Sequence, residues 1–237
     1  SGECADEVFG GYPWFERSVL LEADTFPWCP DLEFRRAVVK PELWESLQVE
    51  DYVQARYQQS LAEMPTLPGE ALWERRRREV GWLSLNWFMS TLLDRKDRMS
   101  MAAGLEVRVP FCDHHLVEYV WNIPWAMKAM NGQRKQVLRD AAEGLLPEEL
   151  LRRPKSPYPK THDPLYEQLV RARLLTILDD RDAPIHSLVD EKALRAGLLS
   201  DAGDYGKPWF GQLMAGPQML AYLIQINEWM SRYHLTV

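Results

Sequence analysis

The chain has 237 residues, of which 46% are apolar, 27% charged and 11% aromatic. This composition is typical of a globular protein with a sizeable core and excludes a disordered or fibrous chain. The 28 basic and 35 acidic side chains give a net charge of -7, which argues against a broad nucleic-acid-binding surface. No apolar run approaches the ~20 residues of a membrane-spanning helix. We therefore expect a soluble protein with no nucleic-acid or membrane partner.

Three cysteines lie far apart along the chain. Cys4, Cys29 and Cys112 form no Cys-x-x-Cys pair and show no metal-ligand spacing. Dispersed cysteines in odd number favour a reducing compartment, and no charged-then-apolar leader is present. The sequence therefore predicts free thiols and a cytoplasmic location.

Apolar residues recur at three- and four-residue spacing along most of the chain, and alternating β-type runs are scarce. The chain is therefore predicted to be mostly α, with prolines breaking the helices. A tight turn at Asn131-Gly132 indicates one short hairpin within residues 127–135. The predicted helices cover residues 4–9, 14–22, 31–39, 41–61, 70–103, 113–122, 134–143, 163–180, 187–199 and 209–232.

Four consecutive arginines occupy the start of the longest predicted helix, at Arg75–Arg78. Such a run is found in RNA-binding and phosphate-binding surfaces. The flanking acids and the apolar pattern that follows favour a solvent-exposed helix start instead. The same helix is predicted to bury Trp82, Leu85, Phe88, Met89 and Leu92.

The first twelve residues, SGECADEVFGGY, place a small turn directly before a helix that carries acids in its first turns. Free N–H groups at a helix start can hold phosphate oxygens, and Asp6 or Glu7 could hold Mg²⁺. This pattern indicates a site for a magnesium nucleotide. The alternative is that Ser1 caps the helix and the acids complement its dipole. The residues alone leave both interpretations open.

Four ordered stretches resemble the signatures of the asparagine synthetases and their relatives, among them the β-lactam synthetases. Residues 1–12 are similar to SGEGxDExFGGY, and residues 95–113 to RxDxMSMxxxLExRVPFLD. Lys135–Arg139 is similar to KxxLR. Leu146-Pro147, followed by Arg153-Pro154-Lys155, is similar to the LP and R-x-K elements of that family.

The resemblance implies the helical C-terminal part of an α/β adenine-nucleotide α-hydrolase-like (PP-loop ATPase) synthetase domain, whose parallel sheet is largely missing here. A single domain is expected over residues 1–237, with the motifs in residues 1–160 and a helical tail in residues 161–237. The oligomeric state stays open, with a homodimer among the alternatives.

The resemblance also implies a reaction. An aspartate side chain is adenylated by ATP with Mg²⁺, and ammonia derived from glutamine then displaces AMP to give asparagine. Carried over by motif, Ser1 and Gly2 contact ATP, with Arg98 as a further ATP contact. Glu3 serves the step that forms and consumes the acyl-adenylate. Asp6 binds Mg²⁺ and pyrophosphate, and Lys155 stabilises negative charge on the phosphates as the second catalytic residue.

Three further residues of the second motif are predicted to be structural. Glu106 and Arg108 are expected to form a buried ion pair that fixes the loop closing the site. Asp113 is expected to cap the helix that follows. The adjacent His114 and His115 are expected to point to different helix faces and to form no metal pair.

The sequence departs from the family pattern in two ways. Cys4 stands where the signature has glycine, which predicts either a pocket that tolerates a thiol or weaker nucleotide binding. The SGGxDS pyrophosphate loop and the glutaminase domain with its nucleophilic cysteine are missing from these residues. We therefore expect a fragment that is inactive by itself. The alternatives are a helical scaffold or regulatory module that has lost catalysis, and a β-lactam-synthetase-like enzyme that adenylates another carboxylate.

Overall fold

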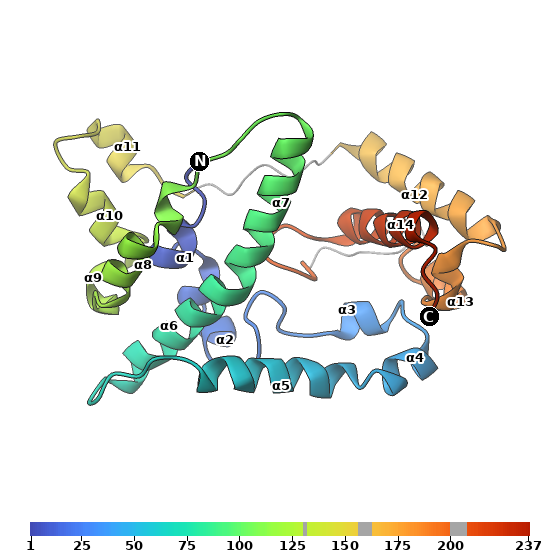
Figure 1. Ribbon diagram of the computed structural model, residues 1–237, viewed down its shortest axis with the longest axis horizontal. Helices are drawn as coiled ribbons and strands as arrows, with labels where there is room; N and C mark the ends of the chain where they lie inside the picture. Colours follow the sequence, from blue (N-terminus) through green and yellow to red (C-terminus); the bar gives the residue numbers. More distant parts are fainter. Residues whose placement is uncertain (130–131, 156–162, 200–207) are drawn as a thin grey trace. The chain divides into compact units, whose positions relative to one another are not determined.

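A computed structural model describes residues 1–129, 132–155, 163–199 and 208–237 (Figure 1). The described residues are mostly helical, as predicted, and their β contacts are the isolated bridges Val39–Val189 and Phe210–Met214. None of the described helices is long and apolar enough to cross a membrane. The chain divides into two compact units, Ser1–Pro27 with Ala55–Pro157 and Trp28–Gln54 with Tyr158–Val237. This division into two units does not test the prediction of a single domain over residues 1–237, which stays a prediction.

The first unit carries all the motif segments. Helix α5 (Val49–Ala62) enters it at residue 55. Its other elements are α1 (Ala5–Phe9), η1 (Pro13–Phe15), α2 (Ser18–Leu21), α6 (Leu72–Leu83), η2 (Ser84–Phe88), α7 (Met89–Ala102), η3 (Pro110–Cys112), α8 (His114–Trp121), α9 (Trp125–Lys128), α10 (Gln136–Ala141) and α11 (Glu148–Arg152).

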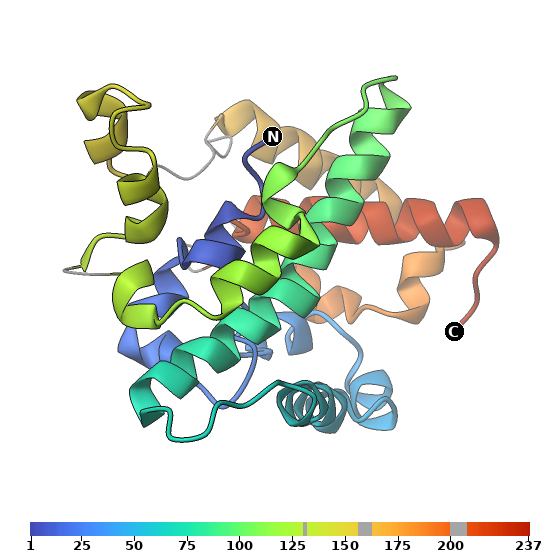
Figure 2. The ribbon, with the colours of Figure 1, turned by 60° about the vertical axis from the view of Figure 1, so that its left-hand side comes forward.

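The core of the first unit forms around α1. Ala5, Val8 and Phe9 lie on one face of this helix and pack on Val120 of α8, as Figure 2 shows for the two ribbons. The ring of Phe9 also meets Phe111 edge to face, with centroids 6.0 Å apart. Burial of this apolar face fixes the acidic face of α1 in place, because each buried side chain of this size contributes about 1.5–3 kcal/mol.

The long helix predicted over residues 70–103 is confirmed. Helix α6, the π-helical turn η2 and α7 follow one another without a break and form one rod in Figure 1. At the π-helical turn, Ser84 donates a hydrogen bond to the carbonyl of Val80 at 2.7 Å and accepts one from the indole of Trp14 at 3.3 Å. Phe88 is buried as predicted, whereas Trp82, Leu85, Met89 and Leu92 are only half-buried.

The predicted exposure of the arginine run is wrong for two of its four members. Arg78 is 3% exposed; its Nε donates to Glu70 at 2.7 Å and its Nη1 to the carbonyl of Trp121 at 2.9 Å. Arg76 donates to the carbonyls of Leu21 and Ala23. These guanidinium groups serve as internal cross-links because each satisfies several acceptors at once. The run therefore offers no continuous basic surface.

Two other local predictions also need correction. The helix predicted over residues 41–61 is two helices, α4 (Pro41–Ser46) and α5, separated at Gln48, whose φ is 47°. The indole of Trp44 bridges the break by donating to Glu50 at 2.7 Å. The hairpin predicted over residues 127–135 begins inside α9, which follows Pro124. Residues 130–131 of that segment lie outside the described residues.

The second unit contains α3 (Glu33–Arg36), α4, the start of α5, α12 (Pro164–Asp179), η5 (Pro184–Ser187), α13 (Glu191–Ala196) and α14 (Gly216–Tyr233). Helices α12 and α14 pack against each other (Figure 1). Their buried leucines and methionines join η5 and α13 in one apolar core that includes Leu174, Ile185, Leu194, Met219 and Leu220.

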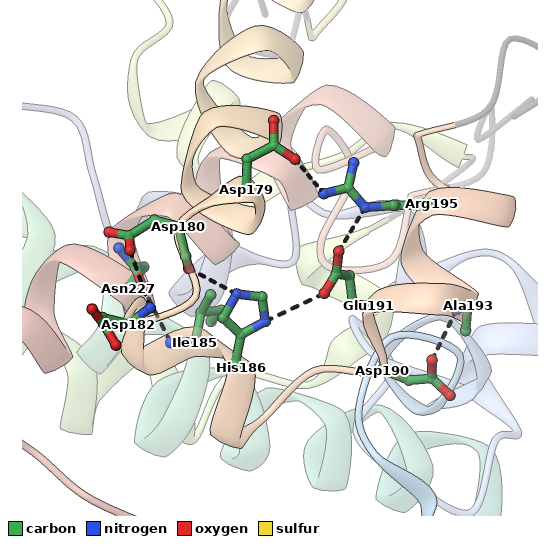
Figure 3. Close-up of polar contacts among 10 residues, drawn as sticks. All are labelled: Asp179, Asp180, Asp182, Ile185, His186, Asp190, Glu191, Ala193, Arg195 and Asn227. Carbon is green, nitrogen blue, oxygen red and sulfur yellow. Dashed lines mark hydrogen bonds and ion pairs between the residues drawn. The ribbon is translucent and has the colours of Figure 1, made fainter.

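Polar contacts hold η5 and α13 in the second unit (Figure 3). The amide oxygen of Asn227 accepts a hydrogen bond from the buried Ile185 N–H at 3.2 Å. The Asp190 carboxylate caps α13 by accepting from Ala193 N at 2.9 Å, so this helix begins after the predicted start at residue 187. Arg195 lies between Asp179 and Glu191, at 2.8 Å from each. The tail thus shares a core with Val38 and its neighbours from residues 28–54.

The first unit contains a buried amine. Lys128 is 3% exposed, and its Nζ lies 5.1 Å from the ring centroid of Trp125. Lys128 lines a small cavity together with Glu7 and Arg78. Burial, reinforced by the nearby charge of Arg78, lowers the pKa of Lys128 to about 7.

We expect this amine to make the stability of the protein depend on pH. Its pKa in the folded chain lies below its ordinary value of 10.5, so the unfolded chain binds the extra proton between pH 7 and 10. The Lys128 contribution is therefore most unfavourable below pH 7 and vanishes toward pH 10, at about 1.4 kcal/mol for each unit of pKa lowering. Denaturant titrations of the wild type and Lys128→Met should show a stability difference that shrinks from pH 7 to 10. The exposed Lys192→Met variant should show no such trend.

Candidate active site

The first motif forms a turn that leads into α1. The hydroxyl of Ser1 accepts a hydrogen bond from the N–H of Glu3 at 3.4 Å, and the Ser1 nitrogen donates to the carbonyl of Arg108 at 2.8 Å. Cys4, with φ 74°, occupies the cap position of α1 and makes no side-chain capping bond. Ser1 therefore does not cap the helix, in contrast to the alternative considered from the sequence. A Cβ added to Gly2 would meet nothing within 4 Å.

Glu3 lies beside two cations of α7. The residue is 9% exposed, and its Oε1 lies 3.4 Å from Arg95 Nη2 and 3.5 Å from Lys96 Nζ. Its Oε2 is buried and has no hydrogen-bond partner among the described residues. A buried carboxylate oxygen without a partner is costly, so Glu3 is held ready to accept a donor. Sequence reasoning gave neither Arg95 nor Lys96 a role, although both belong to the second motif.

Asp6 lies between two lysines from distant motifs. Its Oδ1 is 2.8 Å from Lys135 Nζ and 2.9 Å from Lys155 Nζ. The three side chains are each about one fifth exposed, between 17% and 24%. The structure thus brings Asp6 and Lys155, both predicted from the sequence, into direct contact. The sequence placed Lys135 in a motif but predicted no role for it. Its contact with Asp6 makes it the third residue of the charged cluster.

The carbonyl of Gly11 and the ring of Tyr12 fix the position of Lys155. Its Nζ donates to the Gly11 carbonyl at 3.0 Å and lies 4.4 Å from the Tyr12 ring centroid. Burial lowers the pKa of Lys155, opposed by the Asp6 carboxylate and assisted by the charges of Lys135 and Arg134. An ammonium ion has three donors; one is used by the Gly11 carbonyl, and the charge is also paired with Asp6. Lys155 therefore keeps donor capacity for another acceptor.

The glycine at position 11 is required by the close approach of the charged groups. A Cβ at Gly11 would lie 1.7 Å from Asp6 Oδ1 and 2.5 Å from Lys135 Cε. Such contacts are impossible for real atoms, so only glycine permits the cluster of Asp6, Lys135 and Lys155 as it stands. The Gly-Gly-Tyr part of the first motif therefore has a steric reason in this structure.

The buried carboxylate of Glu7 fixes the position of Tyr12. The Tyr12 hydroxyl donates to Glu7 Oε1 at 2.7 Å, and the ring stacks on Trp14 with centroids 4.2 Å apart. Burial raises the pKa of Glu7, although the Tyr12 hydrogen bond opposes this. Burial and the neighbouring Glu7 raise the pKa of Tyr12 above its ordinary value. Tyr12 therefore stays uncharged, and its ring is held in a fixed position against Lys155.

Arg139 connects the segments that carry the two lysines. Its guanidinium donates to the carbonyls of Arg134 at 3.0 Å and Arg153 at 3.1 Å, and also to the carbonyl of Leu151. Arg134 in turn makes two hydrogen bonds to the carboxylate of Glu16, at 2.8 and 2.6 Å. Arg139 is therefore a positioning residue, and its fixed spacing after Lys135 in the KxxLR motif is the sequence signal for it.

The remaining residues of the second motif lie apart from this cluster. Arg98, a predicted ATP contact, pairs with Asp94 one turn earlier on α7 at 2.7 Å, with 76% of its side chain exposed. Its nucleotide role stays a prediction. Arg108 and Glu106 form the expected ion pair at 2.9 Å, but their side chains are 84% and 65% exposed. The predicted burial of this pair is therefore wrong, because nothing in the described residues covers it.

Asp113 caps α8 as predicted. Its Oδ1 accepts from the N–H groups of His115 at 2.9 Å and Leu116 at 3.4 Å, and these bonds lower its pKa. The His114 and His115 rings lie together, with centroids 3.8 Å apart, so the prediction that they point to different faces is wrong. All three side chains are exposed and could approach one ion.

Cys4 and Cys112 form a disulfide, with Cα atoms 5.8 Å apart and a sequence separation of 108 residues. The prediction of free thiols is thus wrong for these two and holds for Cys29. Sequence spacing could not reveal the pair, because the fold brings η3 against the start of α1.

The described residues define a class of helical protein with a charged site. Asp6 lies between two lysines, and Glu3 adds a second carboxylate with one oxygen that has no hydrogen-bond partner in the described part of the chain. Such a set of charged groups suits the binding of phosphate groups. The sequence model of the asparagine synthase family matches residues 1–231. The chain belongs to the asparagine synthase family.

Individual relatives agree with this assignment. The chain is 49% identical over all its 237 residues to asparagine synthetase [glutamine-hydrolyzing] 3 of Bacillus subtilis, and it spans 38% of that protein's length. Over 73 residues, 31% of this chain and 12% of the relative, it is 42% identical to asparagine synthetase [glutamine-hydrolyzing] 1 of the same organism. It is 29% identical over 191 residues, 67% of this chain and 29% of the relative, to a putative glutamine-hydrolyzing asparagine synthetase of Mycobacterium bovis.

Proposed function

We propose that the chain supplies the helical side of an ATP-dependent ligase site that makes asparagine from aspartate through β-aspartyl-AMP. The observation that carries this proposal is the contact of Asp6 with Lys135 and Lys155, three residues from three separate family motifs. The identity to relatives named as glutamine-hydrolyzing asparagine synthetases supports asparagine as the product. Ammonia released from glutamine is the proposed nitrogen source.

The donor set fits pyrophosphate accompanied by Mg²⁺ better than Mg²⁺ alone. Two ammonium groups already neutralise Asp6 at 2.8 and 2.9 Å, so a bare divalent cation would be repelled. Phosphate oxygens attract both lysines, which frees Asp6 to offer a hard oxygen to the metal. Mg²⁺ held by Asp6 would neutralise charge on the departing pyrophosphate.

Each residue has a proposed part in the reaction. Lys155 donates its remaining N–H to a phosphate oxygen, and Lys135 adds a second charge at the same place. Glu3 is proposed to face the reacting aspartyl group, where its buried Oε2, unpaired among the described residues, would accept a proton from the attacking ammonia as AMP leaves. Ser1, Gly2 and Arg98 are proposed ATP contacts. Stabilisation of developing charge by such fixed groups is the main catalytic effect in this kind of chemistry.

The proposal is tested with the polypeptide that the complete gene encodes. Mixing it with Mg-ATP, aspartate and glutamine should yield AMP, pyrophosphate and asparagine in equal amounts. The 237-residue chain alone should give no aspartate-dependent AMP. AMP formation with a different carboxylate and not with aspartate would favour a β-lactam-synthetase-like reaction, and a complete protein that binds no Mg-ATP would favour a scaffold. A cytoplasmic location and a homodimer, checked by fractionation and light scattering, belong to the same proposal.

Gly11→Ala should weaken pyrophosphate binding without unfolding the protein. The added methyl group would overlap Asp6 and Lys135, so the charged side chains must separate. We expect the dissociation constant of Mg-pyrophosphate, measured by calorimetry on the complete protein, to rise at least about tenfold, which corresponds to about 1.4 kcal/mol. Thermal unfolding of the variant checks that the fold is retained. An unchanged dissociation constant would place the pyrophosphate elsewhere.

A further inference from the structure

The disulfide between Cys4 and Cys112 lies inside the candidate site and is not used by the proposed reaction. Cys4 is the residue between Glu3 and the helix that carries Asp6, and it is 2% exposed. Cys112 ends η3 and is partly buried. The covalent bond thus joins the junction between the Glu3 turn and α1, the helix that carries Asp6, to the segment that follows α7.

The two cysteines depart from the family pattern together. Where the quoted signatures have glycine and leucine, this chain has Cys4 and Cys112. The two positions lie 108 residues apart in sequence and 5.8 Å apart between Cα atoms, within the range that a disulfide spans. Two cysteines introduced independently would have no reason to face each other. The presence of cysteine at both positions is therefore explained by the disulfide that the two residues form.

Other contacts hold the two segments together without the bond. The Phe9 and Phe111 rings meet at 6.0 Å, and Phe111 packs against the apolar cluster of Ala5, Val8 and Phe9. Reduced thiols would therefore stay close enough to pair again. Cys112 is the more accessible of the two residues, so an external thiolate reaches its sulfur first, with Cys4 as the leaving thiolate.

We propose that Cys4 and Cys112 form a reversible thiol–disulfide site that fixes the Glu3 turn and the start of α1, which carries Asp6, when oxidised and loosens them when reduced. Oxidation transfers two electrons and two protons from the two thiols to a small disulfide such as oxidised glutathione, which becomes two thiols. Reduction by a dithiol runs the same exchange in reverse. The proposal rests on the proposed function in one respect only, which is that the loosened turn binds Mg-ATP more weakly.

Thiol counting tests the chemistry on the chain itself. After equilibration in glutathione buffers of increasing reducing strength, alkylation and mass spectrometry should show a two-electron change from one free thiol to three, with Cys29 free throughout. Cys29→Ser should keep the transition. Cys4→Gly, which suits the φ of 74° at this position, should abolish it. Three free thiols in every buffer, or a bond that includes Cys29, would overturn the proposal.

Hydrogen exchange tests the mechanical effect without nucleotide. Amides of residues 1–9 should exchange about tenfold more slowly in the oxidised chain than in the reduced chain, with no difference for Cys4→Gly. Equal exchange in both states would overturn the proposed fixing of the turn.

The link to the nucleotide is tested on the complete protein. Mg-ATP should bind at least about threefold more tightly in the oxidised state, and equal affinity in the two states would overturn the control of binding. A protein that binds Mg-ATP in neither state contradicts the proposed function, whereas thiol counting and exchange decide the disulfide's role independently of it.

Discussion

Lys155→Met should reduce the rate of aspartate-dependent AMP formation by the complete protein about 10²–10³-fold, the loss that follows removal of one fixed donor to a developing negative charge. The side chain is 17% exposed and held by Asp6, Gly11 and the Tyr12 ring, so methionine can occupy much of the same volume. The loss should appear mainly in kcat, because Lys155 is proposed to act on charge that grows during the reaction.

Two further variants make this result specific. Lys192→Met removes an exposed lysine of α13 and should leave the rate unchanged. Asp6→Asn should also lower the rate, but it releases both lysines from their ion pairs, so its effect should not add to that of Lys155→Met. A Lys155→Met rate within threefold of the wild type would remove Lys155 from the proposed mechanism.

Glu70→Ala should lower the free energy of unfolding by about 3–5 kcal/mol, because it leaves the guanidinium of Arg78 buried without its partner charge. The two side chains are 5% and 4% exposed and 2.7 Å apart. Arg78 also donates to the Trp121 carbonyl and lies 5.1 Å from the Trp121 ring, which ties α6 to the end of α8. Urea titration followed by tryptophan fluorescence measures the change.

The chain offers a matched control for this variant. Glu148 and Arg152 form an ion pair of the same length, 2.7 Å, with side chains 68% and 57% exposed. Solvent screens such pairs, so Glu148→Ala should cost less than about 1 kcal/mol. Equal losses for the two variants would show that burial does not decide the strength of the Arg78 interaction.

Local sequence signals gave the positions of the helices. The spacing of apolar residues located α1, α8, α12 and the long rod of α6 and α7. A helix with one apolar stripe can be recognised in this way because the pattern lies within a short stretch of sequence. Asp113 was recognised as a cap for the same reason, since the capping bonds reach only two and three residues ahead. Local signals failed at Gln48, where the Trp44–Glu50 hydrogen bond spans a break that periodicity does not mark.

The motifs selected segments that the structure brings together, but they did not name every side chain of the charged cluster. Glu3, Asp6 and Lys155 were predicted because they stand at fixed places in recognisable strings, and the structure puts Asp6 and Lys155 in contact. Lys135, Arg95 and Lys96 were in the same strings without a role. Their part follows from which side chain reaches which carboxylate, and that depends on packing between segments 90 to 150 residues apart.

The sequence by itself therefore determined the helical class, the family and the positions of the family motifs, because periodicity and motif spacing are properties of short stretches. The tertiary structure decided which charges meet, which are buried and which cysteines pair. Arg78 and Arg75 are neighbours in one run, yet one is enclosed with Glu70 and the other lies 52% exposed. Burial and long-range pairing arise only when distant segments pack. For this reason identical residues in one run can contribute differently to the stability of the fold.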